Sequence, residues 1–397
     1  MKILLAGPVD LEIVREYLLE GTELPTTWAA PITGQLAAAY LQAGHQLHIV
    51  TLHFRRDQDL HVHLTGRNLE IDVLPGHREG PGLRDFWRKE RHGIRDVMLK
   101  SRPDAMHVHW TYEFASAALS TDIPSVITAH DVPSRLWKWM RPRFFWWPRI
   151  AMSVVNGRKA EVLTVPSPAA AVAWRRQMKR KGPIELVPNG LLPHIFRRRD
   201  LSDVRAKSDP TFASVCNGFT QLKNTLNLIR AFAIVKKTLP GARLVMFGHD
   251  HGPDEVAQRI AKQMNAADGI EFRGGVTHQE LLDQLSSEAD VYVHPSLEES
   301  FGMSILEAQA LCIPVIAGVD TGGPPWILDE GLAGRLCDVR RKKALAEAMV
   351  EVARSPDPQQ IEYAYTRARN CFALERVSKR YLELLESAAI KRQIENH

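Results

Sequence analysis

The sequence predicts an α/β protein made of two Rossmann-like domains that face each other across a cleft. Its 397 residues are enough for two domains of ordinary size. In both halves, short apolar runs typical of buried parallel strands alternate with longer helical stretches. Lys2–Ala6 and Thr211–Val215 are the runs that begin the two halves.

The composition is that of an ordinary globular chain, with 45% hydrophobic and 24% charged residues. A net charge of +5 suits an anionic nucleotide, an anionic lipid surface or nucleic acid equally well. Nucleic acid is the least supported, because no zinc finger, RNA-binding signature or basic heptad array is present. The four cysteines lack a metal-binding spacing. Unpaired thiols in a reducing cytoplasm are the simplest account of them. Because no signal-peptide core and no apolar run of about 18 residues is found, we expect neither a signal peptide nor a membrane-spanning helix.

The first strand is followed by Gly7 alone, where a dinucleotide-binding protein would carry G-x-G-x-x-G, so a nicotinamide cofactor is weakly supported. We expect Glu20–Thr33 to be a long loop and Gly34 to open a helix over Gln35–Gln42. The further strands expected in this half are Gln46–Thr51, Asp104–His109, Pro124–Asp131 and Glu161–Ser167.

Polar residues follow several of these strands. Asp57-Gln58-Asp59 has the D-x-D spacing of a metal site, but Arg55 and Arg56 beside it favour a solvated turn. His130 stands where a strand ends, which is where α/β sites gather, although a histidine bonded to backbone is the alternative. We interpret His109 as a structural residue at its strand end, with the cleft as the alternative.

Residues 137–149 interleave aromatic and basic side chains. This mixture suits the headgroup layer of a membrane, so peripheral membrane contact is one interpretation. A buried aromatic patch and an acceptor-binding wall are the others, and base stacking lacks support from the rest of the fold. We expect the two prolines of this segment to prevent one continuous helix.

In the second half, Lys223 comes just before a predicted helix over Leu226–Lys237. A cation is unfavourable there because the helix dipole is positive, so Lys223 suggests an anionic partner, with a solvated lysine as the alternative. His249-Asp250-His251 is interpreted as a plain turn and not as a metal site, because no third ligand is identifiable.

The stretch from Pro295 to Gly323 organises the chain. Strand Ala289–His294 leads through a polar turn to Phe301–Ser304, which should open a helix whose free N–H groups favour an anion such as phosphate. Glu299 precedes this helix and Glu307 lies within it, about 12 Å further along. A surface helix with two solvated acids is the alternative.

Glu299 and Glu307, with Phe301-Gly302 between them, resemble the E-x7-E signature of retaining GT-B glycosyltransferases of family 4. The resemblance implies that the first Glu lies by the donor sugar and the second holds the nucleotide ribose. It also implies that the last helix crosses back to the first domain. The family's Arg would fall on Gly218 or Phe219, and the paired glycines of the family are missing at Gly34.

The resemblance implies Glu299, His130 and Lys223 as catalytic residues, with no metal and no cofactor. The donor-binding residues that it implies are Gly34, Gly218, Lys223, Val276, Glu299, Phe301, Gly302, Met303, Ser304 and Glu307. It also gives an expected domain division: 1–195 for the acceptor, 196–210 as linker, 211–373 for the donor, and 374–397 as a helix on the first domain.

The implied activity is metal-independent hexosyl transfer from a UDP- or GDP-linked sugar to a glycan or lipid-linked acceptor. Such an enzyme would act in the assembly of bacterial surface polysaccharide or glycolipid. The alternative is a non-catalytic partner that kept the fold and binds a glycan or another transferase, because the family's Arg and paired glycines are absent.

Overall fold

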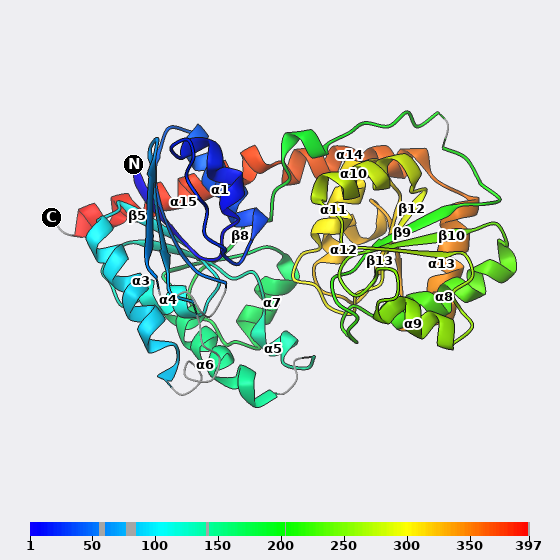
Figure 1. Ribbon diagram of the computed structural model, residues 1–397, viewed down its shortest axis with the longest axis horizontal. Coiled ribbons are helices and arrows are strands. Elements are labelled where there is room, and N and C mark those ends of the chain that lie inside the picture. The colour runs from blue at the N-terminus through cyan, green and yellow to red at the C-terminus, as the bar shows by residue number, and fades with distance from the viewer. Residues whose placement is uncertain (55–59, 77–84, 140–142, 203, 396–397) are drawn as a thin grey trace. The chain divides into compact units, whose positions relative to one another are not determined.

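The computed structural model describes residues 1–54, 60–76, 85–139, 143–202 and 204–395 (Figure 1). The chain divides into two compact units: unit 1 comprises Met1–Gly190 with Leu374–His397, and unit 2 comprises Leu191–Ala373. The Asp57–Asp59 sequence, which has the D-x-D spacing, lies outside the described residues.

Unit 1 contains a sheet that has eight strands in the described ranges, in the order β3-β4-β2-β1-β5-β6-β7-β8. All neighbours are parallel except β3 and β4, which form an antiparallel pair at one edge. The strands are β1 (Lys2–Ala6), β2 (Gln46–Leu52), β3 (Val62–Gly66), β4 (Leu69–Leu74), β5 (Ala105–His109), β6 (Ser125–Thr128), β7 (Val162–Val165) and β8 (Ile184–Leu186).

Helices flank this sheet, and the last helix of the chain returns to it. α15 (Leu374–Glu395, red in Figure 1) contacts α1, β5 and β6, as the expected crossing helix should. The other helices of unit 1 are η1 (a 3-10 helix, Leu11–Tyr17), α1 (Pro31–Gln42), α3 (Arg88–Ser101), α4 (Glu113–Ala118), α5 (Pro133–Leu136), α6 (Arg143–Lys159) and α7 (Pro168–Arg176).

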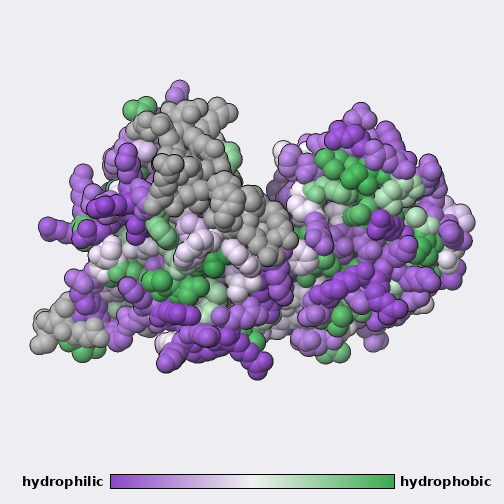
Figure 2. Space-filling view, turned by 90° about the horizontal axis from the view of Figure 1, so that it is seen from below, coloured by the Kyte–Doolittle hydropathy of each residue, from purple (hydrophilic) through white to green (hydrophobic). Residues whose placement is uncertain are grey.

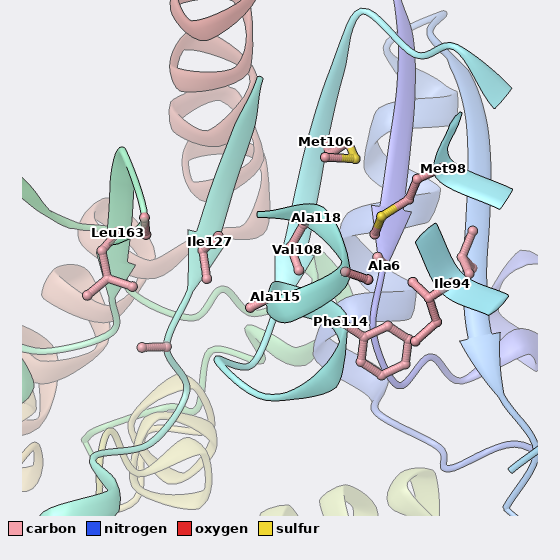
Figure 3. Packing of buried hydrophobic residues seen from close by; sticks show 14 of the residues in the cluster. Ala6, Ile94, Met98, Met106, Val108, Phe114, Ala115, Ala118, Ile127 and Leu163 are labelled. Carbon is pink, nitrogen blue, oxygen red and sulfur yellow. The ribbon is translucent and has the colours of Figure 1, made fainter. Parts of the chain in front are cut away.

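A buried apolar cluster joins the strands of unit 1 to α3, α4 and α7. Figure 3 shows Phe114 of α4 and Ile94 of α3 within this cluster, together with Ala6 of β1 and Val108 of β5. These four side chains are at most 2% exposed. Strands buried in this way explain why their sequences are continuously apolar.

Unit 2 contains a parallel sheet that has six strands in the described residues, in the order β11-β10-β9-β12-β13-β14. The strands are β9 (Thr211–Val215), β10 (Arg243–Phe247), β11 (Ile270–Gly274), β12 (Val291–His294), β13 (Val315–Gly318) and β14 (Arg335–Cys337). The order reverses direction at β9 and β12, the place where ligands bind in open α/β sheets.

The helices of unit 2 include α11, the next element after β12, whose start is the predicted anion-binding position. They are η2 (3-10, Pro193–Ile195), α8 (Thr225–Thr238), α9 (Val256–Gln263), α10 (His278–Glu288), α11 (Met303–Ala310), α12 (Pro324–Ile327), η3 (3-10, Asp329–Gly331), α13 (Lys342–Arg354) and α14 (Pro358–Phe372).

Among the described residues no helix is both long and apolar enough to span a bilayer. In those same ranges no group of three or more His, Cys, Asp and Glu residues is placed to hold a metal ion.

Several predicted elements differ from the structure. The expected loop over Glu20–Thr33 ends early, because α1 begins at Pro31, a residue favoured in the first helical turn. The segment 137–149 is not one continuous helix, as expected, because 137–139 form turns and α6 begins at Arg143, but α6 continues through Pro148, so that proline does not end the helix. α14 was not expected, nor were β3, β4 and α3.

The segment 196–210 is not a free linker. The Arg197 N–H donates to the Ala310 carbonyl at 2.9 Å, and Lys207 forms an ion pair with Asp290 at 2.6 Å. The division between the units accordingly falls after Gly190, and this segment belongs to unit 2.

Candidate functional site

The loop between β12 and α11 is held by backbone pairing with the turn that follows β13. The Glu299 N–H donates to the Thr321 carbonyl at 2.8 Å, and the Gly323 N–H donates to the Glu299 carbonyl at 2.9 Å. Gly302 caps α11 with a φ of +123°, a backbone conformation that favours glycine. α11 has no side-chain cap, and its first internal hydrogen bond runs from the Ile305 N–H to the Gly302 carbonyl at 3.1 Å, so the N–H groups of Met303 and Ser304 ahead of it form the kind of site that binds anions.

Glu299 and Lys223 form an ion pair beside this helix end. Glu299 Oε1 accepts a hydrogen bond from Lys223 Nζ at 2.6 Å and lies 3.6 Å from Nε2 of His294, the buried last residue of β12. Burial alone would raise the pKa of Glu299, but the Lys223 charge and His294 outweigh it and hold this pKa well below its usual range. Glu299 is therefore ionised at neutral pH.

The turn that carries Lys223 is tied to the loop that carries Glu299. The Leu297 N–H donates to the Leu222 carbonyl at 2.8 Å. Asn224 adopts a φ of +57°, and its side-chain amide donates to the Pro295 carbonyl at 3.0 Å. The lysine is thus aimed at the carboxylate by the backbone of both turns.

Glu307, on the buried side of α11, has a separate basic partner. Its Oε1 lies 2.9 Å from Nε2 of His278, the first residue of α10. The Glu307 carboxylate raises the pKa of His278 above its ordinary value, against the lowering effect of burial. His278 remains half-exposed, so a ligand that reaches Glu307 would also meet this imidazole.

Gly218 and Phe219, where the family's Arg was expected, form a tight turn. Gly218 has a φ of +87°, and its N–H donates to the His249 carbonyl at 3.0 Å. The Phe219 N–H donates to Asp250 Oδ2 at 3.0 Å. His251 is fully buried and bonds the His249 carbonyl at 2.8 Å. The residues 249–251 therefore support the neighbouring turn, in line with the interpretation as a plain turn.

The remaining predicted residues of unit 2 differ in what their side chains do. The Phe301 ring is 3% exposed and packs edge-on against Trp326 and Phe372, so only its backbone is available to a ligand. Ser304 Oγ lies 3.5 Å from Nδ1 of His294. Val276 follows β11 and packs against the core while partly exposed.

In unit 1, His130 follows β6 and stacks on His109. Their rings lie 5.0 Å apart at 12°, and His109 Nδ1 is 2.7 Å from His130 Nε2. Burial lowers the pKa of His130 to about 4. Among the described residues, the His130 ring is thus held by a side chain and not by backbone.

Gly34 was expected to open a helix, but α1 begins three residues earlier, at Pro31. It sits inside the first turn of α1, where its N–H donates to the Ala30 carbonyl at 3.2 Å. A Cβ at this position would lie 2.7 Å from the Asp10 carbonyl oxygen. The structure therefore explains this glycine by close packing of α1 on the preceding segment.

The aromatic and basic segment 137–149 is only partly described, since 140–142 lie outside the described residues. Trp147 of α6 is 57% exposed. Arg149 instead turns inward. Its Cζ lies 4.5 Å from the centre of the Trp87 ring, and its Nη1 lies 3.6 Å from Glu113 Oε2. The segment is therefore neither wholly buried nor wholly a basic surface.

The structure brings together Lys223 and Glu299, as the sequence suggested, and adds three residues that sequence reasoning missed. These are Asn224, His278 and His294, each a partner of a predicted residue or of its turn. A histidine at a strand end was a usable signal for His294, but nothing in the spacing linked His278 to Glu307.

Two family models match this chain in turn. Residues 32–192 match the model described as Glycosyltransferase Family 4, and residues 197–369 match the model described as Glycosyl transferases group 1. Together with the two parallel-sheet units, these matches show a glycosyltransferase of the GT-B type. The chain belongs to the family 4 group of these enzymes.

Known proteins of this kind resemble the chain over much of its length. It is 28% identical to a D-inositol 3-phosphate glycosyltransferase of Paenarthrobacter aurescens (strain TC1), over 80% of this chain and 82% of that protein. It is 24% identical to an N-acetyl-alpha-D-glucosaminyl L-malate synthase of Bacillus anthracis, over 50% of this chain and 52% of that protein. Its fold resembles a sucrose-phosphate synthase from Thermosynechococcus elongatus, with a TM-score of 0.77 and 18% identity, over 98% of both chains.

Proposed function

We propose that this protein is a retaining hexosyltransferase that uses a UDP- or GDP-linked sugar and needs no metal ion. The acceptor is a glycan or a lipid-linked saccharide in bacterial surface polysaccharide or glycolipid assembly. The single observation that carries the proposal is the Lys223–Glu299 ion pair beside the first turn of α11. A lysine and free helical N–H groups together supply the positive charge that a leaving diphosphate requires.

In the proposed reaction the bond between the anomeric carbon and the diphosphate oxygen breaks, and the acceptor oxygen bonds to that carbon on the same face. The acceptor proton passes to the leaving phosphate oxygen. Lys223 and α11 stabilise the negative charge that develops on the diphosphate. We do not assign Glu299 as a covalent nucleophile, because transfer on a single face of the sugar requires none, and it instead orients the donor sugar.

The other roles follow from the same assignment. Glu307 accepts hydrogen bonds from the ribose hydroxyls, in exchange for its present contact with His278. His130 positions the donor sugar. Gly218, Val276, Phe301 and Ser304 line the donor through backbone or small side-chain contacts.

The test is a screen of purified protein against UDP- and GDP-linked sugars in metal-free buffer, with release of the nucleoside diphosphate as the readout. Glu299→Ala should abolish release, whereas Glu347→Ala, which removes an exposed acid on α13, should leave it unchanged. Proton NMR of the first-formed product should show the anomeric configuration of the donor. Unchanged turnover by Glu299→Ala would refute the assignment, and binding without turnover would favour the non-catalytic alternative.

We also propose peripheral contact with the cytoplasmic face of a membrane through α6. Trp147 supports this proposal because it is 57% exposed and follows Trp146 at the start of that helix. Figure 2 shows one face of the molecule, on which hydrophobic residues form small groups among hydrophilic ones. In flotation with anionic liposomes, the Trp146→Ala/Trp147→Ala variant should no longer float with the liposomes. Trp28→Ala, which removes a tryptophan that is 62% exposed elsewhere in unit 1, should float as the wild type does. Equal recovery of both variants would count against membrane contact.

A further inference from the structure

Two histidines of β5 are completely buried in unit 1, and the proposed reaction uses neither of them. His107 and His109 are two residues apart, so both side chains leave the strand on the same side. Their rings lie 4.2 Å apart. Because a buried polar group is costly unless it is bonded, the partners of each ring nitrogen show what the histidine does.

His107 is satisfied at both nitrogens. Its Nδ1 lies 2.9 Å from the Tyr40 hydroxyl of α1, and its Nε2 lies 2.9 Å from Thr128 Oγ1 of β6. Thr128 in turn bonds Thr164 Oγ1 of β7 at 2.7 Å and the Tyr381 hydroxyl of α15 at 3.3 Å. This closed network ties α1 and α15 to the sheet, which is a structural role.

His109 is satisfied at only one nitrogen. Its Nδ1 lies 2.7 Å from Nε2 of His130, whereas its own Nε2 is buried without a hydrogen-bond partner among the described residues. Burial lowers the pKa of His109 well below its ordinary value and that of His130 to about 4, so both rings are neutral at pH 7. One proton therefore lies between the two facing nitrogens.

The unpartnered nitrogen decides which ring holds that proton. If His130 donated from Nε2, the single proton of His109 would sit on its own Nε2, as a buried N–H with no acceptor. Orphaned N–H groups of this kind are rarer and more costly than an unused lone pair. His109 therefore donates from Nδ1, and His130 accepts at Nε2 and carries its own proton on Nδ1.

The surroundings hold both rings in this arrangement. Gly7 follows β1 with a φ of +155°, and a Cβ there would lie 2.8 Å from the Cβ of His109. Only glycine leaves the space that His109 occupies. The Trp110 ring lies 4.5 Å from the ring of His130 and limits its rotation.

We propose that His109 is a positioning residue that fixes the tautomer of His130, so that His130 offers an Nδ1–H donor to an oxygen acceptor, a hydroxyl of the donor sugar. The inference rests on the proposed function, in which His130 meets that sugar. It specifies the chemistry of the contact: His130 donates a hydrogen bond and does not act as a general base. A sugar that lacks the contacted hydroxyl would lose this interaction.

The tautomer can be measured without any turnover. Proton–nitrogen NMR correlations of the imidazole rings, assigned with a His130→Gln variant, should show a protonated Nδ1 and an unprotonated Nε2 for His130. In His109→Leu this single pattern should give way to a mixture of tautomers. A wild-type His130 that is protonated on Nε2 would overturn the inference, whatever the activity.

The kinetic test uses two substitutions of the same residue. His109→Asn keeps a donor near the position of Nδ1 and should retain most of kcat/KM, whereas His109→Leu removes the donor and should lose about tenfold, the factor for one hydrogen bond. The loss should shrink for deoxy sugars that lack the contacted hydroxyl. Equal loss in both variants, with matched thermal midpoints, would contradict a positioning role. If no nucleotide sugar is turned over although the tautomer is as expected, the proposed function fails and the tautomer assignment stands.

Discussion

Replacing Lys223 by methionine should destabilise unit 2 through Glu299, and the structure gives the size of the effect. At 2.6 Å and an effective dielectric constant of about 20, the two charges attract by about 6 kcal/mol. Desolvation of both ions offsets several kcal/mol of this attraction, and the side chains keep 26% and 20% exposure. We therefore expect a net loss of about 2 kcal/mol in Lys223→Met.

The dependence on pH distinguishes this cause from lost packing. In the wild type, the lowered pKa of Glu299 stabilises the fold at pH values above the ordinary glutamate pKa of about 4.3. This stabilisation is lost as pH falls through the pKa of Glu299 in the folded state. Without Lys223, burial should raise that pKa instead. The variant should then lose stability as pH rises through the raised value, which is the opposite sign.

Thermal unfolding of four proteins at pH 5 and pH 8 is the assay: the wild type, Lys223→Met, Glu299→Gln and the double variant. At pH 8 the midpoint for Lys223→Met should fall by about 4–8 °C, the shift expected for about 2 kcal/mol in a unit of this size. The double variant should recover most of the loss, because no unpaired charge remains. A double variant that is as unstable as Lys223→Met at pH 8 would refute the reasoning.

Three further predictions concern other residues. Phe219→Arg restores the family's second cation and should tighten nucleoside diphosphate binding about tenfold at low salt; calorimetry should find no such gain in Phe219→Met. Donor affinity should rise as pH increases through the raised pKa of His278, because deprotonation weakens its hold on Glu307, and titrations of His278→Asn should show a flat profile. Gly157→Ala should lower the thermal midpoint, because a Cβ there would lie 2.1 Å from the Trp174 ring. Overpacking of this kind costs about 1–3 kcal/mol, which outweighs the gain of about 1 kcal/mol from the higher helix propensity of alanine.

The sequence predicted the parallel strands well because their burial makes them continuously apolar, as in β5 and β12. It also predicted the helix that follows Glu299, since glycine and a polar turn mark its start. α14 was missed although its pattern was present: Ile361, Ala364 and Ala368 are buried at helical spacing after Pro358. That error came from overlooking a period and not from an absent signal.

The edge strands β3 and β4 could not be predicted in the same way. Asp72 lies in the middle of β4, and a buried charge argues against a strand until its partners are known. Those partners come from other strands: His48 of β2 at 2.6 Å and His63 of β3 at 3.1 Å. Only pairing of the strands brings them together, so local sequence carries no trace of it.

The same limit applies to the candidate site. The spacing of Glu299 and Glu307 places two carboxylates along one helix, but it does not say what neutralises them. In the structure each carboxylate has its own basic partner from a different element: Lys223 before α8 and His278 at the start of α10. Under the proposed function, a bound nucleotide sugar would therefore exchange two contacts, with its diphosphate competing for Lys223 and its ribose competing for Glu307. Salt should weaken the first exchange, and pH should control the second through His278, so different chemistry would control how each end of the proposed donor binds.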